Sequence, residues 1–164
     1  AIFSWKNGRL SPEPSNGIQG ENGLWNCIRT LDADGDGDAD GDGDTDADAV
    51  AMADKITHLR IFSDAEGKMN RSIQDIGGRL LLVPQFTLAA DTRSGLRPSF
   101  SSSAPPALAR RLFEHAVTVA IDILGAAKVQ QGAFGADMAV SLDNDGPVTF
   151  WLETGGPADP AAGR

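Results

Sequence analysis

The chain has 164 residues and a mass of 17.2 kDa, which is enough to bury one ordinary hydrophobic core. Apolar residues make up 41% of it but never form a run of about 18, so the composition excludes a membrane-spanning helix. The single cysteine, Cys27, excludes an internal disulfide and suits a reducing compartment, and residues 1–10 lack a secretory pattern. We therefore expect a cytoplasmic protein.

Charge is distributed unevenly along the chain. Nine aspartates fall between Asp32 and Asp48, and without them 14 acidic residues face 14 basic ones. The segment 54–111 carries nine basic and five acidic residues, a local balance of +4. Phosphate binding needs a local basic patch and not a basic protein, so the net charge of −9 still allows an RNA partner. A mixed, solvated surface explains the same residues equally well.

The N-terminal quarter of the chain has little regular pattern. Residues 1–31 are rich in Gly, Asn, Ser and Pro without a sustained hydrophobic period, so we expect loops with at most short strands. Asp32–Asp44 alternates Asp with Ala or Gly, which predicts a solvated, acidic low-complexity insertion. The same run opens like a calcium-binding EF-hand loop, but Gly43 stands where that loop requires a bidentate Glu.

Regular structure is predicted from Thr45 onward. Thr45 can cap a helix, since the apolar residues that follow recur at helical spacing: Ala49, Met52, Ala53, Ile56 and Leu59. A short strand is expected over residues 60–63, with a turn over 64–67. The apolar residues of 79–83 predict a strand that is buried on both faces.

A second helix and a hairpin are predicted in the C-terminal half. The helix is expected to carry Pro105-Pro106 in its first turn and to stop at Gly125. Beyond it, apolar residues alternate over 138–142 and again over 148–152, on either side of an Asn-Asp-Gly turn. Two alternating runs around such a turn predict an antiparallel hairpin.

Together these elements predict an α+β fold, in which two helices pack on an antiparallel, barrel-like β-sheet. We expect one domain over residues 1–154. The Gly-, Pro- and Ala-rich segment 155–164 is expected to form a flexible tail.

The sequence lacks the usual machinery of a hydrolase. The histidines His58 and His115 have no Gly-x-Ser-x-Gly elbow or cysteine partner, and no His, Cys and Glu cluster has metal-ligand spacing. We therefore expect neither a metal nor a cofactor. The candidates that remain are Gln85, Phe86 and Thr87, where main-chain amides could polarise an ester carbonyl as an oxyanion hole. Thr87 could instead be a nucleophile, or an ordinary threonine at the end of a strand.

Three strings resemble those of the bacterial D-aminoacyl-tRNA deacylases: Pro84-Gln85-Phe86-Thr87-Leu88, Phe134-Gly135-Ala136-Asp137-Met138, and Asn144-Asp145-Gly146-Pro147-Val148-Thr149. The resemblance covers residues 46–153. It implies a cytosolic homodimer that hydrolyses the ester joining a D-amino acid, or glycine, to tRNA. It also implies that the 2′-hydroxyl of the terminal adenosine assists the reaction, so that little side-chain chemistry is required.

The resemblance assigns further residues to the substrate site. It implies that the Gly146-Pro147 peptide is cis, enters the active site of the other subunit, and leaves no room for an L side chain. It also implies that Phe134 and Met138 line the adenosine pocket, although a Phe and a Met at this spacing would otherwise be assigned to the core. Without the resemblance, Asn-Asp-Gly-Pro is simply a good turn.

Pro84, Arg93 and Arg97 complete the candidate site. Pro84 stands where the commoner family string has Ser, and it removes one amide donor from the loop. Arg93 and Arg97 are the expected phosphate contacts, with surface solvation as the alternative. Two other functions stay open: a non-catalytic, calcium-binding acidic module around residues 32–44, or an inactive family member, because residues 1–31 do not match the N-terminal strand of the family.

Overall fold

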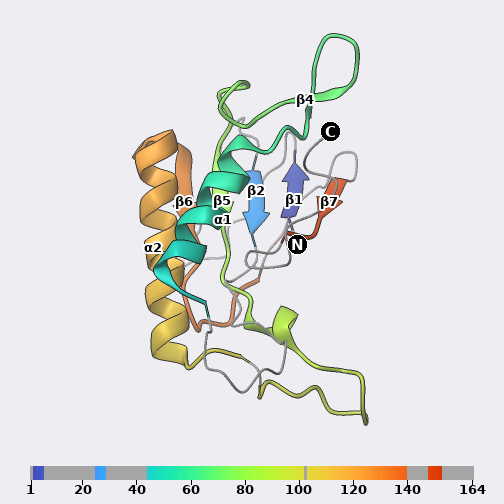
Figure 1. The fold of residues 1–164 in the computed structure, drawn as a ribbon, viewed down its shortest axis with the longest axis vertical. Coiled ribbons are helices and arrows are strands. Elements are labelled where there is room, and N and C mark those ends of the chain that lie inside the picture. Colours follow the sequence, from blue (N-terminus) through green and yellow to red (C-terminus); the bar gives the residue numbers. More distant parts are fainter. Residues whose placement is uncertain (1, 6–24, 29–43, 102, 140–147, 153–164) are drawn as a thin grey trace.

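The computed structural model describes residues 2–5, 25–28, 44–101, 103–139 and 148–152 (Figure 1). In chain order the elements are β1 (Ile2–Trp5), β2 (Trp25–Ile28), α1 (Asp46–His58), β3 (Phe62–Ser63), β4 (Met69–Arg71), β5 (Leu80–Leu82), the 3₁₀ turn η1 (Phe86–Ala89), α2 (Pro106–Leu124), the 3₁₀ turn η2 (Ala126–Lys128), β6 (Val129–Gln131) and β7 (Val148–Phe150). The mixture of helices and strands confirms the predicted α+β class.

The main sheet has five strands in the order β6-β5-β2-β1-β7, and β3 and β4 form a separate two-stranded sheet. β1 pairs antiparallel with β2 and β7, but β5 pairs parallel with both β2 and β6. The expectation of an antiparallel sheet is therefore wrong for the side of the sheet formed by β2, β5 and β6. The chain returns from β5 to β6 through α2, and such a crossover brings the next strand back in the same direction. No pairing between β6 and β7 closes the described strands, so a barrel stays a prediction.

The predicted C-terminal hairpin is only partly present. β7 lies within the expected strand 148–152, but it pairs with β1, with Phe150 opposite Ile2. Met138 and Ala139 belong to no strand, and residues 140–147 lie outside the described part of the chain. Two strands were not predicted: β4, which pairs with β3, and β6, which borders β5 and pairs Leu81 with Gln130.

The two strands of residues 1–31 lie in the middle of the main sheet. β1 and β2 pair with each other and separate β5 from β7 (Figure 1). This confirms the expectation of short strands there. A segment with no recognisable hydrophobic period therefore supplies two of the three interior strands.

Both helices begin and end close to the predicted residues. At the start of α1, the backbone N–H and the hydroxyl of Thr45 donate to Asp48 Oδ2 at 2.9 and 2.6 Å. These hydrogen bonds hold the pKa of Asp48 below its usual range. α2 ends at Gly125, whose φ of 91° suits glycine and whose N–H donates to the Ile121 carbonyl at 2.7 Å.

The hydrophobic core lies between the two helices and the β5–β6 side of the sheet (Figure 1). α1 and α2 pack against each other, and α2 also packs against β6. Buried side chains come from each of these layers: Ile56, Leu80, Leu112, Ala120 and Val129. Among the described residues, neither helix is long and apolar enough to cross a membrane.

Candidate functional site

The chain leaves the core abruptly at the end of β5. Leu80–Leu82 and Pro84 are buried, whereas Gln85, Phe86 and Thr87 are exposed, with 59% of Phe86 accessible. Gln85 Nε2 donates to Thr87 Oγ1 at 2.5 Å, which fixes the two polar side chains against each other. The backbone N–H groups of Phe86 and Thr87 donate to no backbone acceptor within the described part of the chain. The role of these donors in polarising a carbonyl group stays a prediction.

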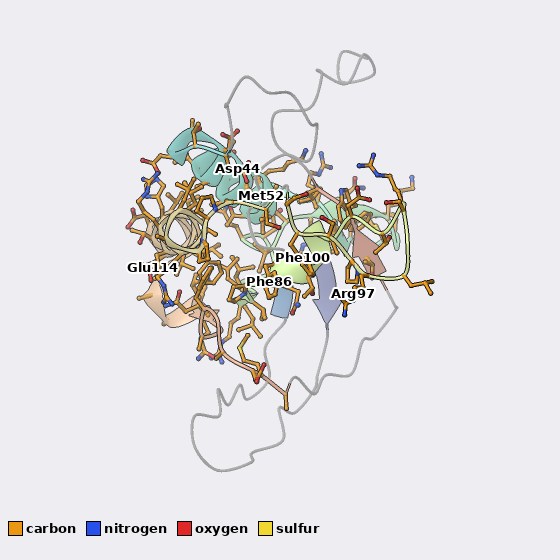
Figure 2. All side chains as sticks on the ribbon, turned by 90° about the horizontal axis from the view of Figure 1, so that it is seen from below. Asp44, Met52, Phe86, Arg97, Phe100 and Glu114 are labelled. Atoms are coloured by element: carbon orange, nitrogen blue, oxygen red, sulfur yellow. The ribbon has the colours of Figure 1, made fainter. Side chains whose placement is uncertain are left out.

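Phe86 is held in place by an aromatic neighbour. The rings of Phe86 and Phe100 lie 5.2 Å apart between centroids, tilted by 55°, and Figure 2 shows them side by side. Phe100 directly follows an arm formed by residues 91–99, which is closed by reciprocal backbone hydrogen bonds between Asp91 and Ser99 at 2.8 and 2.9 Å. The aromatic pair therefore connects the loop after β5 to the base of this arm.

The two arginines that are predicted to contact phosphates, Arg93 and Arg97, both lie on this arm, but only Arg93 is held by an ion pair among the described residues. Arg93 Nε and Nη2 donate to the two carboxylate oxygens of Asp91 at 3.0 and 2.9 Å. These hydrogen bonds lower the pKa of Asp91 to about 2 and raise that of Arg93. Arg97 is exposed and makes no ion pair with the described residues. Arg97 is thus the cation that is more available to bind a phosphate. In Figure 2 it lies at the side of the molecule opposite to Glu114 on α2.

A second group of predicted site residues meets on the other side of Pro84. A Cβ placed on Gly132 would lie 3.3 Å from Pro84 Cδ and 3.0 Å from Met138 Sδ. The Gly132 N–H also donates to the Leu82 carbonyl at 2.8 Å. The structure therefore brings Pro84 and Met138 together over a glycine, with 37% of Met138 exposed.

Phe134 lies against α2 and is only partly exposed. Its ring centroid is 6.3 Å from that of the buried Phe113, and the guanidinium carbon of Arg110 lies 4.7 Å above the ring. Arg110 Nη2 also donates to the Phe134 carbonyl at 3.4 Å. In the sequence Arg110 stands out only as one of the basic residues, because nothing in the local pattern links it to a residue 24 positions away.

Other predicted features fall outside the described residues. Gly146 and Pro147 lie in the undescribed segment 140–147. The aspartate run lies in the undescribed segment 29–43, except for Asp44, which is described. Within the described residues, no group of three or more His, Cys, Asp or Glu side chains is placed to hold a metal ion.

Comparison with known families gives a direct match. The family model described as D-Tyr-tRNA(Tyr) deacylase matches residues 40–153. A "D-aminoacyl-tRNA deacylase" of Pseudomonas fluorescens (strain Pf0-1) is 61% identical over 108 residues, which span 63% of this chain and 73% of the relative. One from Teredinibacter turnerae is 63% identical over 105 residues, which span 63% and 70%.

Solved structures share the overall fold. A "c-Myc DNA Unwinding Element Binding Protein" superposes with a TM-score of 0.76 at 25% identity, over 93% of this chain and 96% of that one. A "probable eukaryotic D-amino acid tRNA deacylase" gives a TM-score of 0.69 at 17% identity, over 89% and 94%. The second likeness shows the fold alone. Because both alignments extend beyond residues 40–153, they include part of the N-terminal region.

Proposed function

The chain belongs to the D-Tyr-tRNA(Tyr) deacylase family, and we propose that it hydrolyses the ester bond of D-aminoacyl-tRNA. The observation that carries this proposal is the family match over residues 40–153. Relatives that are named for this activity are about 60% identical to the chain where they align. The reaction consumes water and releases a free D-amino acid and an intact tRNA. It serves quality control in translation, and we extend it to glycine carried by the wrong tRNA.

We assign the chemistry to the exposed loop Gln85–Thr87. Water attacks the ester carbonyl carbon, and negative charge develops on its oxygen, where the N–H groups of Phe86 and Thr87 would donate. The bond to the 3′ oxygen of the terminal ribose then breaks, and that oxygen leaves with a proton. The neighbouring 2′-hydroxyl orients the water, which accounts for a loop that offers amides and no charged base. The Gln85–Thr87 hydrogen bond supports this role by fixing the loop.

The terminal adenosine is assigned to the surface beside Pro84. Met138 is partly exposed next to Pro84, and a thioether suits contact with a nucleobase. Phe134 lies in the same loop and offers an aromatic ring. Arg97 is the proposed contact for a tRNA phosphate, because its guanidinium has no competing ion pair among the described residues.

Chiral selection is assigned to Gly146 and Pro147, which we propose act across a homodimer. In this arrangement, two main-chain carbonyls from the partner subunit occupy the space that an L side chain would need. Steric exclusion discriminates more strongly than an added attraction. Pro147→Ala removes the ring that fixes this peptide, so the rates on D- and L-substrates should converge. Hydrolysis of the D-ester at the wild-type rate, with the L-ester still ignored, would place selection elsewhere.

The decisive experiment compares D-Tyr-tRNA with L-Tyr-tRNA, each with and without EDTA. We expect release of the D-amino acid only, at a rate that EDTA does not change. Release of both enantiomers would contradict chiral selection, and no release would contradict the activity. No release combined with a calcium-dependent change in circular dichroism would instead favour a calcium-binding role for residues 32–44.

A further inference from the structure

The loop that carries Phe134 and Met138 has few anchors. Residues 132–139 form no helix or strand, and their backbone is tied to the sheet by the Gly132–Leu82 hydrogen bond. Beyond Gly132, Arg110 on α2 donates a side-chain hydrogen bond to this loop. The position of Phe134 therefore depends on contacts with the helix.

Arg110 holds Phe134 in two ways at once. Its guanidinium lies over the ring, with Cζ 4.7 Å from the centroid, and Nη2 donates to the carbonyl of the same residue at 3.4 Å. A planar guanidinium can make both contacts because its donors form a rigid fork, whereas the ammonium of lysine is a point charge. The buried Phe113 also packs near this ring, so the ring contacts both the guanidinium and the core.

The charge of Arg110 is only weakly balanced by another side chain. Its Nη1 lies 4.0 Å from Glu114 Oε1, and both side chains are more than half exposed, so this ion pair contributes little. The guanidinium is thus held mainly by Phe134. Arg111, the next residue on α2, instead pairs with Asp46 at the start of α1 at 2.6 Å. The two neighbouring arginines have the same charge and different partners.

We infer that Arg110 is a positioning residue, which fixes the ring of Phe134 and its loop for binding of the terminal adenosine. The inference rests on the proposed function, because it concerns the same site. Arg110→Gln removes the ring contact and the charge while keeping a polar side chain. We expect KM for D-Tyr-tRNA to rise by about fivefold, the scale of an exposed cation–π contact, with kcat nearly unchanged. Arg110→Lys should recover little of this loss.

Arg111→Gln is the matched control, because it removes the same charge from the same helix without touching Phe134. It should leave KM near the wild-type value, and the salt dependence of KM should be the same in all these variants. If Arg110→Lys restores KM fully, or if Arg110→Gln lowers the salt slope by about one, Arg110 acts as a phosphate contact and the inference is wrong. Equal KM values for Arg110→Gln and Arg111→Gln would also overturn it.

A second readout does not depend on catalysis. The chain has three methionines, and Met138 shares the loop with Phe134, whereas Met52 is buried in the core and Met69 is exposed on β4. With ¹³C-methyl methionine, Arg110→Gln should shift the Met138 signal and leave that of Met69 unchanged. No shift would contradict the positioning role even in an active enzyme. A shift in a protein that cleaves no D-aminoacyl-tRNA would preserve the positioning role and reject the proposed function.

Discussion

Pro84 and Met138 approach each other over Gly132, at a point where a side chain would meet both. A Cβ on Gly132 would lie 3.0 Å from Met138 Sδ and 3.3 Å from Pro84 Cδ, closer than ordinary van der Waals contact. The backbone of Gly132 is held there by its hydrogen bond to the Leu82 carbonyl. The absence of a side chain therefore lets a buried residue after β5 pack beside a partly exposed one on the 132–139 loop.

Gly132→Ala should weaken activity more than stability. The added methyl group would displace the flexible thioether of Met138 before it disturbs Pro84, which is buried. Because a small misplacement at a binding site is costly, we expect kcat/KM for D-Tyr-tRNA to fall by about tenfold. Steady-state kinetics and the melting temperature, measured on the same preparation, separate the two effects.

Gly67→Ala provides the contrast. Gly67 has φ 78° in the turn between β3 and β4, with nothing within 4 Å of an added Cβ. Alanine is strained there, so this variant should lose about 1 kcal/mol of stability and keep its kcat/KM. If Gly132→Ala loses no more activity than Gly67→Ala, the contact between Pro84 and Met138 is not part of the site.

Thr87→Ala tests whether a side chain does the chemistry. The Thr87 hydroxyl accepts a hydrogen bond from Gln85, so its loss should loosen the loop and reduce kcat by about tenfold or less. The backbone N–H groups remain in the variant. A fall in kcat of roughly 10⁴-fold, as when a true nucleophile is removed, would show that Thr87 attacks the ester. Mass spectrometry of a quenched reaction would then detect the acylated enzyme.

The pair Asp91 and Arg93 should make stability depend on pH in acid. Hydrogen bonds from Arg93 lower the pKa of Asp91 to about 2, below the value of about 3.9 expected in the unfolded chain. The stabilisation is therefore complete above about pH 4 and is lost as the pH falls towards 2. An NMR titration of the Asp91 carboxyl carbon should show a midpoint near 2. In Arg93→Gln it should move up towards the ordinary value.

Local signals in the sequence predicted the helices well. The first helix begins where Thr45 and Asp48 bond to each other, and the second ends where Gly125 adopts a positive φ. Both interactions join residues that are three or four positions apart, so the local sequence is sufficient to predict them. The loop at Gln85 was predicted for the same reason, since a buried apolar run simply ends there.

Pairings between distant segments could not be predicted from the pattern. β6 has three residues, Val129–Gln131, and too few alternations to mark a strand. Its place beside β5 depends on the crossover through α2. The contact of Arg110 with Phe134 likewise joins α2 to a loop beyond β6. Such contacts follow from the packing of whole elements and have no local signal.

Removing residues 32–43 tests whether the aspartate run matters to the enzyme. The deletion should stop before Asp44, because that residue is partly buried directly before the Thr45–Asp48 cap of α1. It removes six aspartates, which leaves 17 acidic residues against 14 basic ones and changes the net charge from −9 to −3. We expect an unchanged melting temperature and kcat, and a lower KM for D-Tyr-tRNA at low salt, because repulsion of the phosphates decreases.

A variant that keeps the length of the run separates charge from chain connectivity. Replacing the six aspartates of residues 32–43 by asparagine should reproduce the lower KM. In both variants the difference from wild type should disappear at high salt, where the Debye length falls to about 3 Å. If the deletion lowers the melting temperature and the asparagine variant does not, the run has a structural role between the N-terminal strands and α1. If neither variant changes KM at low salt, the aspartates lie too far from the bound tRNA to act on it.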